Sequence, residues 1–189
     1  MLLDNKFKTI LDSLDKPATS HHAGDKQLCY LTYEPSLTLE VKRKLPNWLS
    51  LAKGYQFECS VLSIAQVTND FFRNNPRRKG WPVPDASSGY DEIIDFFKDD
   101  LGSMIISNRV IEKSILEKQE TCKHQKRPLL ILSDIEALHP FTRFGPIEQN
   151  IYNEIEIPLI ILYPGSLSGS SLEFLGYYPP DGNYRSKHF

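Results

Sequence analysis

The sequence predicts an α/β fold with three layers, in which helices cover both faces of a mainly parallel sheet of about five strands. Two apolar runs, at residues 128–133 and 157–163, have the length and composition of strands buried on both faces. The segment 141–156 between them is long enough for a crossover helix, and such a unit forms a parallel pair with a right-handed connection. Ligands and partners meet open sheets at the carboxyl ends of the strands, so we expect a site at that edge.

The N-terminal half is predicted to alternate between helices and strands. Apolar residues recur every three or four positions from Leu2 to Leu14, which is the spacing of one helix stripe. This helix ends before Pro17, because the residue preceding a proline resists helical geometry. Segments 28–33 and 57–62 are rich in strand formers and are predicted to be strands. Segments 38–53 and 64–74 are predicted to be helices. Pro46 lies within the second helix, and we expect it to kink or split that helix.

The C-terminal half is predicted to continue the same alternation. Residues 91–126 keep a helical spacing of apolar side chains, the two central strands follow, and 171–178 has the composition of a fifth strand. The Pro-Gly pair at 164–165 is expected to end the second central strand. We therefore predict one α/β domain over 1–189, with an N-terminal helix and loop, 1–27, packed on it.

The composition is that of an ordinary globular protein. Of the 189 residues, 40% are hydrophobic and 24% are charged, and the formal charge is −2, so no overall basic bias points to nucleic acid or a membrane. No run is long and apolar enough to span a bilayer, and the N-terminus has no apolar signal core. The three cysteines lack metal-type spacing and are expected to be reduced thiols. These features predict a cytoplasmic protein without membrane contact.

Two carboxylates follow the first central strand, at Asp134 and Glu136. Four apolar residues before such a pair are similar to the acidic strand of P-loop ATPases, where the aspartate holds magnesium and the glutamate polarises water. The phosphate-binding signature Gly-x-x-x-x-Gly-Lys-[Ser/Thr] is absent from the whole sequence. The prediction is therefore an outline like that of a P-loop nucleotide hydrolase without the Walker A loop, no ATP hydrolysis and no cofactor.

Asp134, Glu136 and His139 could instead be metal ligands, since carboxylates two apart on an extended strand point the same way. Carboxylates at strand ends more often cap a following helix or bond loop amides, so we predict structural roles, with no metal and no catalytic residue. The full set of predicted structural residues at the strand ends and in the tail is Asp134, Glu136, His139, Tyr163, Gly165 and Arg185.

The segment 73–90 is long and polar for a loop in a compact domain, which is typical of functional loops. It carries four basic residues beside Trp81. One interpretation is a tip that contacts phosphates or docks a partner through Trp81; the other is a solvated loop whose tryptophan packs back onto the core.

The C-terminal third carries a further pattern. Its pieces, in order, are Leu129–Pro140, Pro158–Gly165, Phe174–Gly176 and Asn183–Arg185. Together they resemble the BrxB family of bacterial BREX bacteriophage-defence systems. The resemblance implies a small cytoplasmic protein that works beside a methyltransferase, an ATPase and PglZ, an alkaline-phosphatase-like subunit. It implies no known catalytic activity.

We therefore predict a non-catalytic adaptor that binds the PglZ-type subunit, with weak DNA contact only through the complex. The docking surface is predicted to comprise the loops 73–90, 134–146 and 164–170. The candidate partner-binding residues are Arg77, Arg78, Trp81, Arg143 and Phe144. Two alternatives remain. One is a nucleic-acid-binding module using Arg77, Arg78, Lys79 and Arg185, and the other is a divergent metal-dependent hydrolase using Asp134, Glu136 and His139.

Overall fold

The computed structural model describes residues 2–16, 26–80, 89, 91, 95, 97–168, 171–176, 178–179 and 186–189. At its centre lies an open sheet in the order β2-β3-β4-β1-β6, whose neighbouring strands run parallel. A further strand, β5, pairs antiparallel with the distal part of β4. The strands are β1 (Leu28–Tyr33), β2 (Glu58–Ser63), β3 (Pro128–Ser133), β4 (Leu159–Ser168), β5 (Ser171–Phe174) and β6 (Lys187–His188). The predicted α/β fold with a mainly parallel sheet is confirmed.

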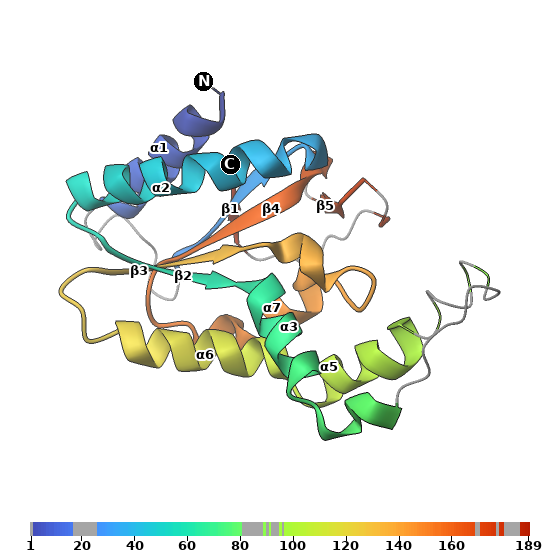
Figure 1. Cartoon of the computed structure of the whole chain (residues 1–189). Helices are drawn as coiled ribbons and strands as arrows, with labels where there is room; N and C mark the ends of the chain where they lie inside the picture. Colours follow the sequence, from blue (N-terminus) through green and yellow to red (C-terminus); the bar gives the residue numbers. More distant parts are fainter. Residues whose placement is uncertain are drawn as a thin grey trace.

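Helices cover both faces of this sheet (Figure 1). The α-helices are α1 (Leu2–Leu14), α2 (Thr38–Gly54), α3 (Ile64–Arg73), α5 (Ser103–Ser107), α6 (Val110–Cys122) and α7 (Phe144–Ile151). Short 3-10 helices are η2 (Pro35–Leu37), η3 (Pro76–Gly80), η5 (Ile135–Leu138) and η6 (Tyr152–Glu154), and η4 (Phe97–Gly102) is a π-helix. None of the helices within the described ranges has the length and apolar character that a membrane span requires.

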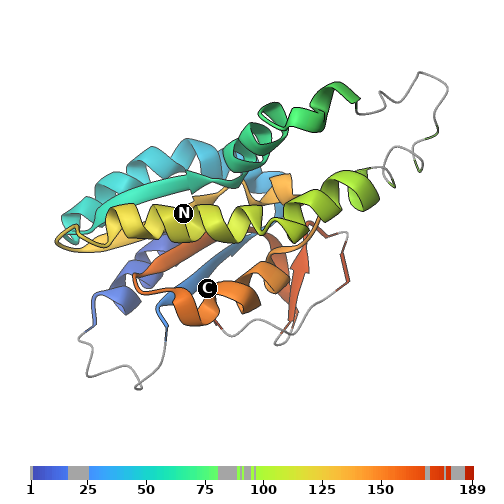
Figure 2. The same cartoon turned by 90° about the horizontal axis from the view of Figure 1, so that it is seen from below.

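The strand order explains why the helices divide between two faces. From β1 the chain crosses β4 and β3 to reach β2 at the sheet edge, and then returns through β3 to β4. Because parallel connections are right-handed, this reversal of direction moves the connecting helices from one face to the other. Accordingly α1 and α2 lie on one face, and α3, α6 and α7 lie on the other, as Figure 2 shows from below.

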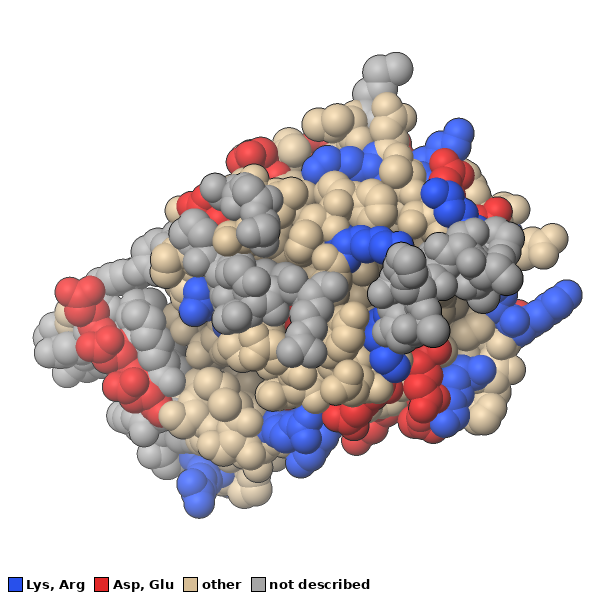
Figure 3. Space-filling view, turned by 180° about the vertical axis from the view of Figure 1, so that it is seen from behind, with Lys and Arg blue, Asp and Glu red and all other residues tan. Residues whose placement is uncertain are grey.

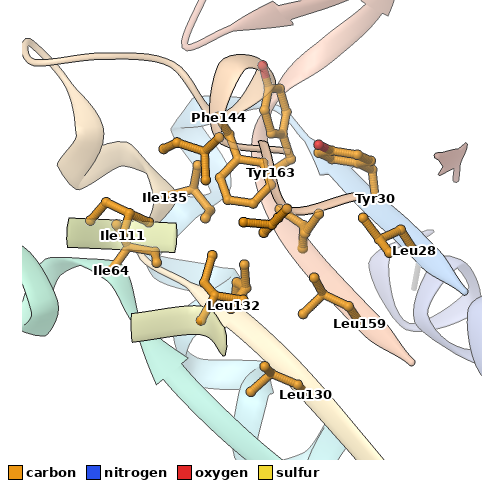
Figure 4. Close-up of a cluster of buried hydrophobic side chains, with 14 of the residues drawn as sticks. Leu28, Tyr30, Ile64, Ile111, Leu130, Leu132, Ile135, Phe144, Leu159 and Tyr163 are labelled. Carbon is orange, nitrogen blue, oxygen red and sulfur yellow. The ribbon is translucent and has the colours of Figure 1, made fainter. Parts of the chain in front are cut away.

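The core consists of two layers, one on each side of the sheet. Successive residues of a central strand point into opposite layers. Tyr30 and Leu132 pack toward α3, α6 and α7, whereas Ile131 and Ile160 pack toward α1 and α2. Figure 4 shows the first of these layers, with side chains from strands and helices meeting in one cluster. Burial on both faces is why these strands are continuous apolar runs rather than alternating ones.

Helix α2 runs unbroken through Pro46, so of the two expected outcomes, a kink or a split, the split is wrong. A proline inside a helix removes one backbone hydrogen bond and costs about 3 kcal/mol. Burial of Val41, Trp48 and Ala52 against the sheet offsets this, at roughly 1.5–3 kcal/mol for each large apolar side chain. Trp48 also stacks on Phe7 of α1, with ring centroids 4.9 Å apart.

Strand β4 runs through the Pro-Gly pair at 164–165, where we expected it to end. It changes partner there: Pro164 is the last residue in register with parallel β1, and Gly165 is the first opposite antiparallel β5. The predicted strand at 171–178 ends at Phe174, and the two-residue β6 was not predicted. The predicted loop 73–90 begins with the end of α3 and the 3-10 helix η3, and most of it beyond Gly80 lies outside the described residues.

Candidate functional site

The carboxyl ends of the parallel strands bring the predicted residue Asp134 together with residues that were not predicted. Asp134 follows β3 directly, Ser63 ends β2, and Tyr33 ends β1. Helix α2, which leaves β1 on one face, carries Lys42 to the same edge. This is the edge at which an open α/β sheet places its sites.

An ionic cluster lies at this edge, and we call it the strand-end cluster. The Lys42 ammonium lies 2.7 Å from Asp134 Oδ1 and 2.8 Å from Glu136 Oε1, so one cation bridges both carboxylates. The other oxygen of Asp134 accepts hydrogen bonds from Ser63 Oγ at 2.5 Å and from Ser133 Oγ at 3.0 Å. The cluster thus consists of Lys42, Ser63, Ser133, Asp134 and Glu136.

Of the structural roles expected for a strand-end carboxylate, helix capping is not the role of Asp134. Asp134 occupies the position before η5 with φ 58° and ψ 36°, a left-handed conformation that aspartate tolerates better than most residues, but its side chain makes no capping hydrogen bond. Ser63 is the residue that caps, because its Oγ accepts from the backbone N–H of Gln66 at the start of α3. A serine followed three residues later by glutamine is a sequence signal for such a cap.

Electrostatics favour the charged forms of Asp134 and Lys42. Burial by itself raises the pKa of the Asp134 carboxyl. The hydrogen bonds from Lys42, Ser63 and Ser133 together lower this pKa by more than burial raises it, so it lies below the ordinary value. Burial likewise lowers the pKa of Lys42, and its hydrogen bonds to Asp134 and Glu136 outweigh this and raise it. Burial, followed by the charge of Glu136, raises the pKa of the nearby Tyr33 hydroxyl.

The three residues considered as metal ligands do not converge on one point. Asp134 and Glu136 face Lys42, whereas His139 Nδ1 lies 2.9 Å from the hydroxyl of Tyr178. Glu136 Oε2 is buried without a hydrogen-bond partner among the described residues. Within the same residues, no group of three His, Cys, Asp or Glu side chains is arranged to hold a metal ion.

The loop between β1 and α2 stands where a phosphate-binding loop would precede its helix. It consists of Glu34 and the 3-10 helix η2, which begins at Pro35, and it contains no glycine. A phosphate cradle needs consecutive backbone N–H groups that approach the ligand closely, and proline has none. The carboxylates at the end of β3 therefore face a lysine from within α2, Lys42, rather than a phosphate loop.

The lowered pKa of Asp134 predicts an acid-sensitive part of the stability. A carboxyl whose pKa is lower folded than unfolded stabilises the fold above the unfolded value of about 3.9, and this is lost as the pH falls through the folded value. We expect Asp134→Asn to reduce the free energy of unfolding by about 1–2 kcal/mol at pH 7. The difference from wild type should shrink between pH 5 and 3, measured by urea denaturation at each pH.

Asp4 provides an independent comparison for this experiment. Hydrogen bonds from Lys44 and Trp48 lower its pKa to about 2, and it joins α1 to α2 away from the strand-end cluster. Asp4→Asn should therefore reduce the acid dependence in the same direction, and the two effects should add because the sites share no partner. If Asp134→Asn and wild type differed equally at every pH, the ion pair with Lys42 would not contribute to folding.

A second feature is a hollow of about 630 Å³ between α3 and η5, which we call the α3–η5 hollow. Arg73 and Arg78 supply its cations, and Phe72 and Phe141 contribute ring surface with centroids 5.2 Å apart. The remaining lining residues are Ala65, Thr68, Asn69 and Ala137. The start of the predicted segment 73–90 and the loop 134–146 therefore meet here, whereas Gly165 of the third predicted loop lines a different pocket, beside β1 and α1.

The other predicted partner residues have mixed placements. Arg77 and Arg78 are exposed on η3, and Trp81 lies outside the described residues, as does Arg185. Arg143 lies over the ring of Tyr178 at 5.7 Å and is half-buried.

The prediction that Phe144 contacts a partner is corrected by the structure, because its side chain is fully buried rather than presented at the surface. Its ring packs edge-on against Tyr30 at 6.3 Å, and Figure 4 shows it pointing into the core. The predicted loop 134–146 ends earlier than expected, because α7 begins at Phe144. Apolar residues of α7 face the sheet, so Phe144 is not available to a partner in this structure.

Two structural residues have clear roles. Gly165 is required by the close approach of β5, since a Cβ there would lie 2.0 Å from the carbonyl oxygen of Glu173. Tyr163 is buried between Tyr30 and Phe174, with ring centroids 5.4 Å from each. Both belong to the packing of β4 rather than to an open site.

Sequence reasoning missed Lys42 of the strand-end cluster and Arg73, Asn69 and Thr68 of the hollow. The helix 64–74 was predicted, but nothing in a single sequence says which of its polar residues will line a hollow. Lys42 is one of several basic residues in its helix, and the sequence alone does not distinguish it from the others. Only the cap at Ser63 carried a local signal.

Comparison with known proteins identifies the family. No curated protein and no solved structure matched the chain. The sequence profile of the family described as "BREX protein BrxB" matches residues 89–189, just over half of the chain. The match includes Asp134 and Glu136 of the strand-end cluster and Ala137 and Phe141 of the hollow. The chain therefore belongs to the BrxB family of the BREX phage-defence system.

Proposed function

We propose that this BrxB-family chain is a non-catalytic adaptor, which docks the PglZ-type subunit of its BREX complex through the carboxyl edge of the sheet. The observation that carries the proposal is the α3–η5 hollow. Two segments predicted from the sequence as docking loops, far apart in the chain, line this one concave surface with arginine and aromatic side chains. Arginine and aromatic residues are those that protein interfaces favour.

The strand-end cluster supports the non-catalytic part of the proposal. Lys42 and two serine hydroxyls satisfy three of the four carboxylate oxygens of Asp134 and Glu136. A carboxylate that accepts several hydrogen bonds and an ion pair is a weak base, because its charged form is strongly favoured. The cluster therefore suits the task of joining α2, β2 and β3 better than it suits proton transfer.

The first test is co-purification with the PglZ-type subunit from cells that carry the whole operon. We expect the double variant Arg73→Glu with Arg78→Glu, at the two arginines that line the hollow, to retain less than about a tenth of the wild-type yield of partner, since losing interface hot spots costs roughly 2 kcal/mol or more. Arg43→Glu is the matched control, because Arg43 is exposed on α2, on the opposite face of the sheet from α3.

Circular dichroism and thermal unfolding of each purified variant establish that it is folded. Undiminished partner yield with a folded double variant would remove the α3–η5 hollow from the interface. Turnover of nucleotides or DNA by the purified protein with magnesium or manganese, lost in Asp134→Asn, would contradict the non-catalytic role.

A further inference from the structure

We propose that the α3–η5 hollow binds an acidic peptide segment of a protein partner, in which a carboxylate stands beside an apolar side chain. The inference rests on the proposed function only in taking the partner to be a subunit of the defence complex. The recognition chemistry is argued from the hollow itself.

The cations of the hollow select for negative charge. Arg73 at the end of α3 and Arg78 of η3 are both exposed, and among the described residues no aspartate or glutamate lines the hollow with them. Within the described part of the chain, neither guanidinium forms an ion pair. A guanidinium presents a planar pair of N–H donors that matches a carboxylate in two parallel hydrogen bonds.

Local hydrogen bonds fix the backbone from which the Arg78 side chain projects. The side chain of Asn75 accepts a hydrogen bond from the backbone N–H of Arg77 at 2.9 Å, and its carbonyl accepts from the backbone N–H of Arg78 at 3.1 Å. These bonds fix the turn from α3 into η3. A preorganised turn reduces the entropy lost when the arginine binds.

One polar group in the wall of the hollow, the hydroxyl of Thr68, has no hydrogen-bond partner among the described residues. Thr68 is 7% exposed, and its Oγ1 is buried. A buried hydroxyl in this state is unfavourable, so a small shift of the wall that lets a polar ligand group or a bridging water reach it is favoured. Asn69, one residue along α3, is exposed and adds an amide that donates and accepts.

The aromatic surface accounts for the apolar part of the ligand. Phe72 and Phe141 are only half-buried, and the small side chains of Ala65 and Ala137 leave space beside them. The volume of about 630 Å³ is within the range of sites that enclose whole side chains. A Leu, Ile or Phe next to the carboxylate would cover these rings while the acid reaches the arginines.

A protein segment fits this site better than nucleic acid. Duplex-binding proteins neutralise many phosphates, commonly about 6–10, along an extended basic surface. Here two arginines, Arg73 and Arg78, line the hollow within the described residues, the formal charge of the chain is −2, and on the face in Figure 3 acidic and basic side chains are mixed. A concave hollow with two arginines and an aromatic surface favours one or two carboxylates on a peptide.

The test is a peptide array probed with the full-length protein. The array carries overlapping 12-residue peptides, a length of about 40 Å when extended, covering the other proteins of the operon, together with copies in which Asn and Gln replace Asp and Glu. We expect the bound peptides to pair Asp or Glu with a neighbouring Leu, Ile or Phe, and the amide copies not to bind. Fluorescence anisotropy with the best peptide then measures affinity.

The double variant Arg73→Glu with Arg78→Glu should have an affinity for this peptide about a hundredfold lower than wild type, since two charge-assisted contacts become repulsive. Arg43→Glu should leave the affinity unchanged, and Thr68→Val should weaken it a few-fold while keeping the shape of the hollow.

An array without bound peptides, without acidic preference, or with equal binding by the folded arginine variant would overturn the inference. Tighter binding of a 20-nucleotide single strand at the same arginines would also overturn it and assign the site to nucleic acid. These outcomes are separate from the adaptor test, because acidic peptides from any subunit can bind even where the PglZ-type subunit does not co-purify.

Discussion

Gly165→Ala is expected to lower the free energy of unfolding by about 3 kcal/mol or more, the largest effect of any single methyl group that we anticipate. The added Cβ would lie 2.0 Å from the carbonyl oxygen of Glu173 and 2.8 Å from Cε1 of Tyr163. The first of these neighbours is backbone on the paired strand β5, so it moves only if the β4–β5 ladder moves. Urea denaturation at pH 7 measures the loss.

Gly54→Ala is the matched control for this variant. Gly54 ends α2, nothing lies within 4 Å of the position that a Cβ would take there, and its φ is not in the left-handed region. Alanine there reduces the freedom of the unfolded chain and should stabilise the protein by roughly 0.4–1 kcal/mol. Equal stability of Gly165→Ala and wild type would mean that β5 does not approach β4 as closely as the structure shows.

Phe144→Ala is expected to lower the free energy of unfolding by about 3–5 kcal/mol, the usual range for a fully buried phenylalanine. The ring is fully buried and contacts Tyr30 edge-on, so the truncation leaves a cavity between α7 and the sheet. Thermal and urea unfolding measure the effect. The result would explain any loss of phage defence in this variant through loss of folded protein.

Arg143→Ala provides the comparison one residue earlier in the chain. Arg143 lies over the ring of Tyr178 and donates a long hydrogen bond of 3.4 Å to the carbonyl of Pro179, so its loss should cost about 0.5–1 kcal/mol. A small stability change for Phe144→Ala, similar to that for Arg143→Ala, would contradict the burial of the ring and restore Phe144 as a surface residue.

Periodicity was sufficient to predict most of the secondary structure. The helix at 2–14 and the strand at 28–33 have the boundaries expected from their apolar patterns, and the two central strands begin within two residues of the predicted positions. These signals are local, because a helix stripe or a doubly buried strand determines which residues are apolar along its own length. The errors at Pro46 and at 164–165 arose where packing with distant segments overrode a local preference.

The site was predicted less completely. The sequence predicted the edge of the sheet at which the strand-end cluster lies, together with its carboxylates Asp134 and Glu136, because strand ends in parallel sheets share one edge. It also indicated that arginines of 73–90 and the loop after β3 could act together. It did not show that Phe144 is buried, since an aromatic residue after a loop has the same local pattern whether it faces solvent or core.

By itself, the sequence determined the α/β architecture, the parallel central strands, the lack of a phosphate-loop signature and the family pattern of the C-terminal third. Only the tertiary structure decided that Lys42 bridges the two carboxylates and that α3 and η5 enclose one hollow. Both features join residues that are far apart in the chain, such as Lys42 with Asp134 or Arg73 with Phe141. Contacts of this kind depend on strand order and on which face each connection crosses, and these follow from the packing of the whole chain rather than from any local pattern.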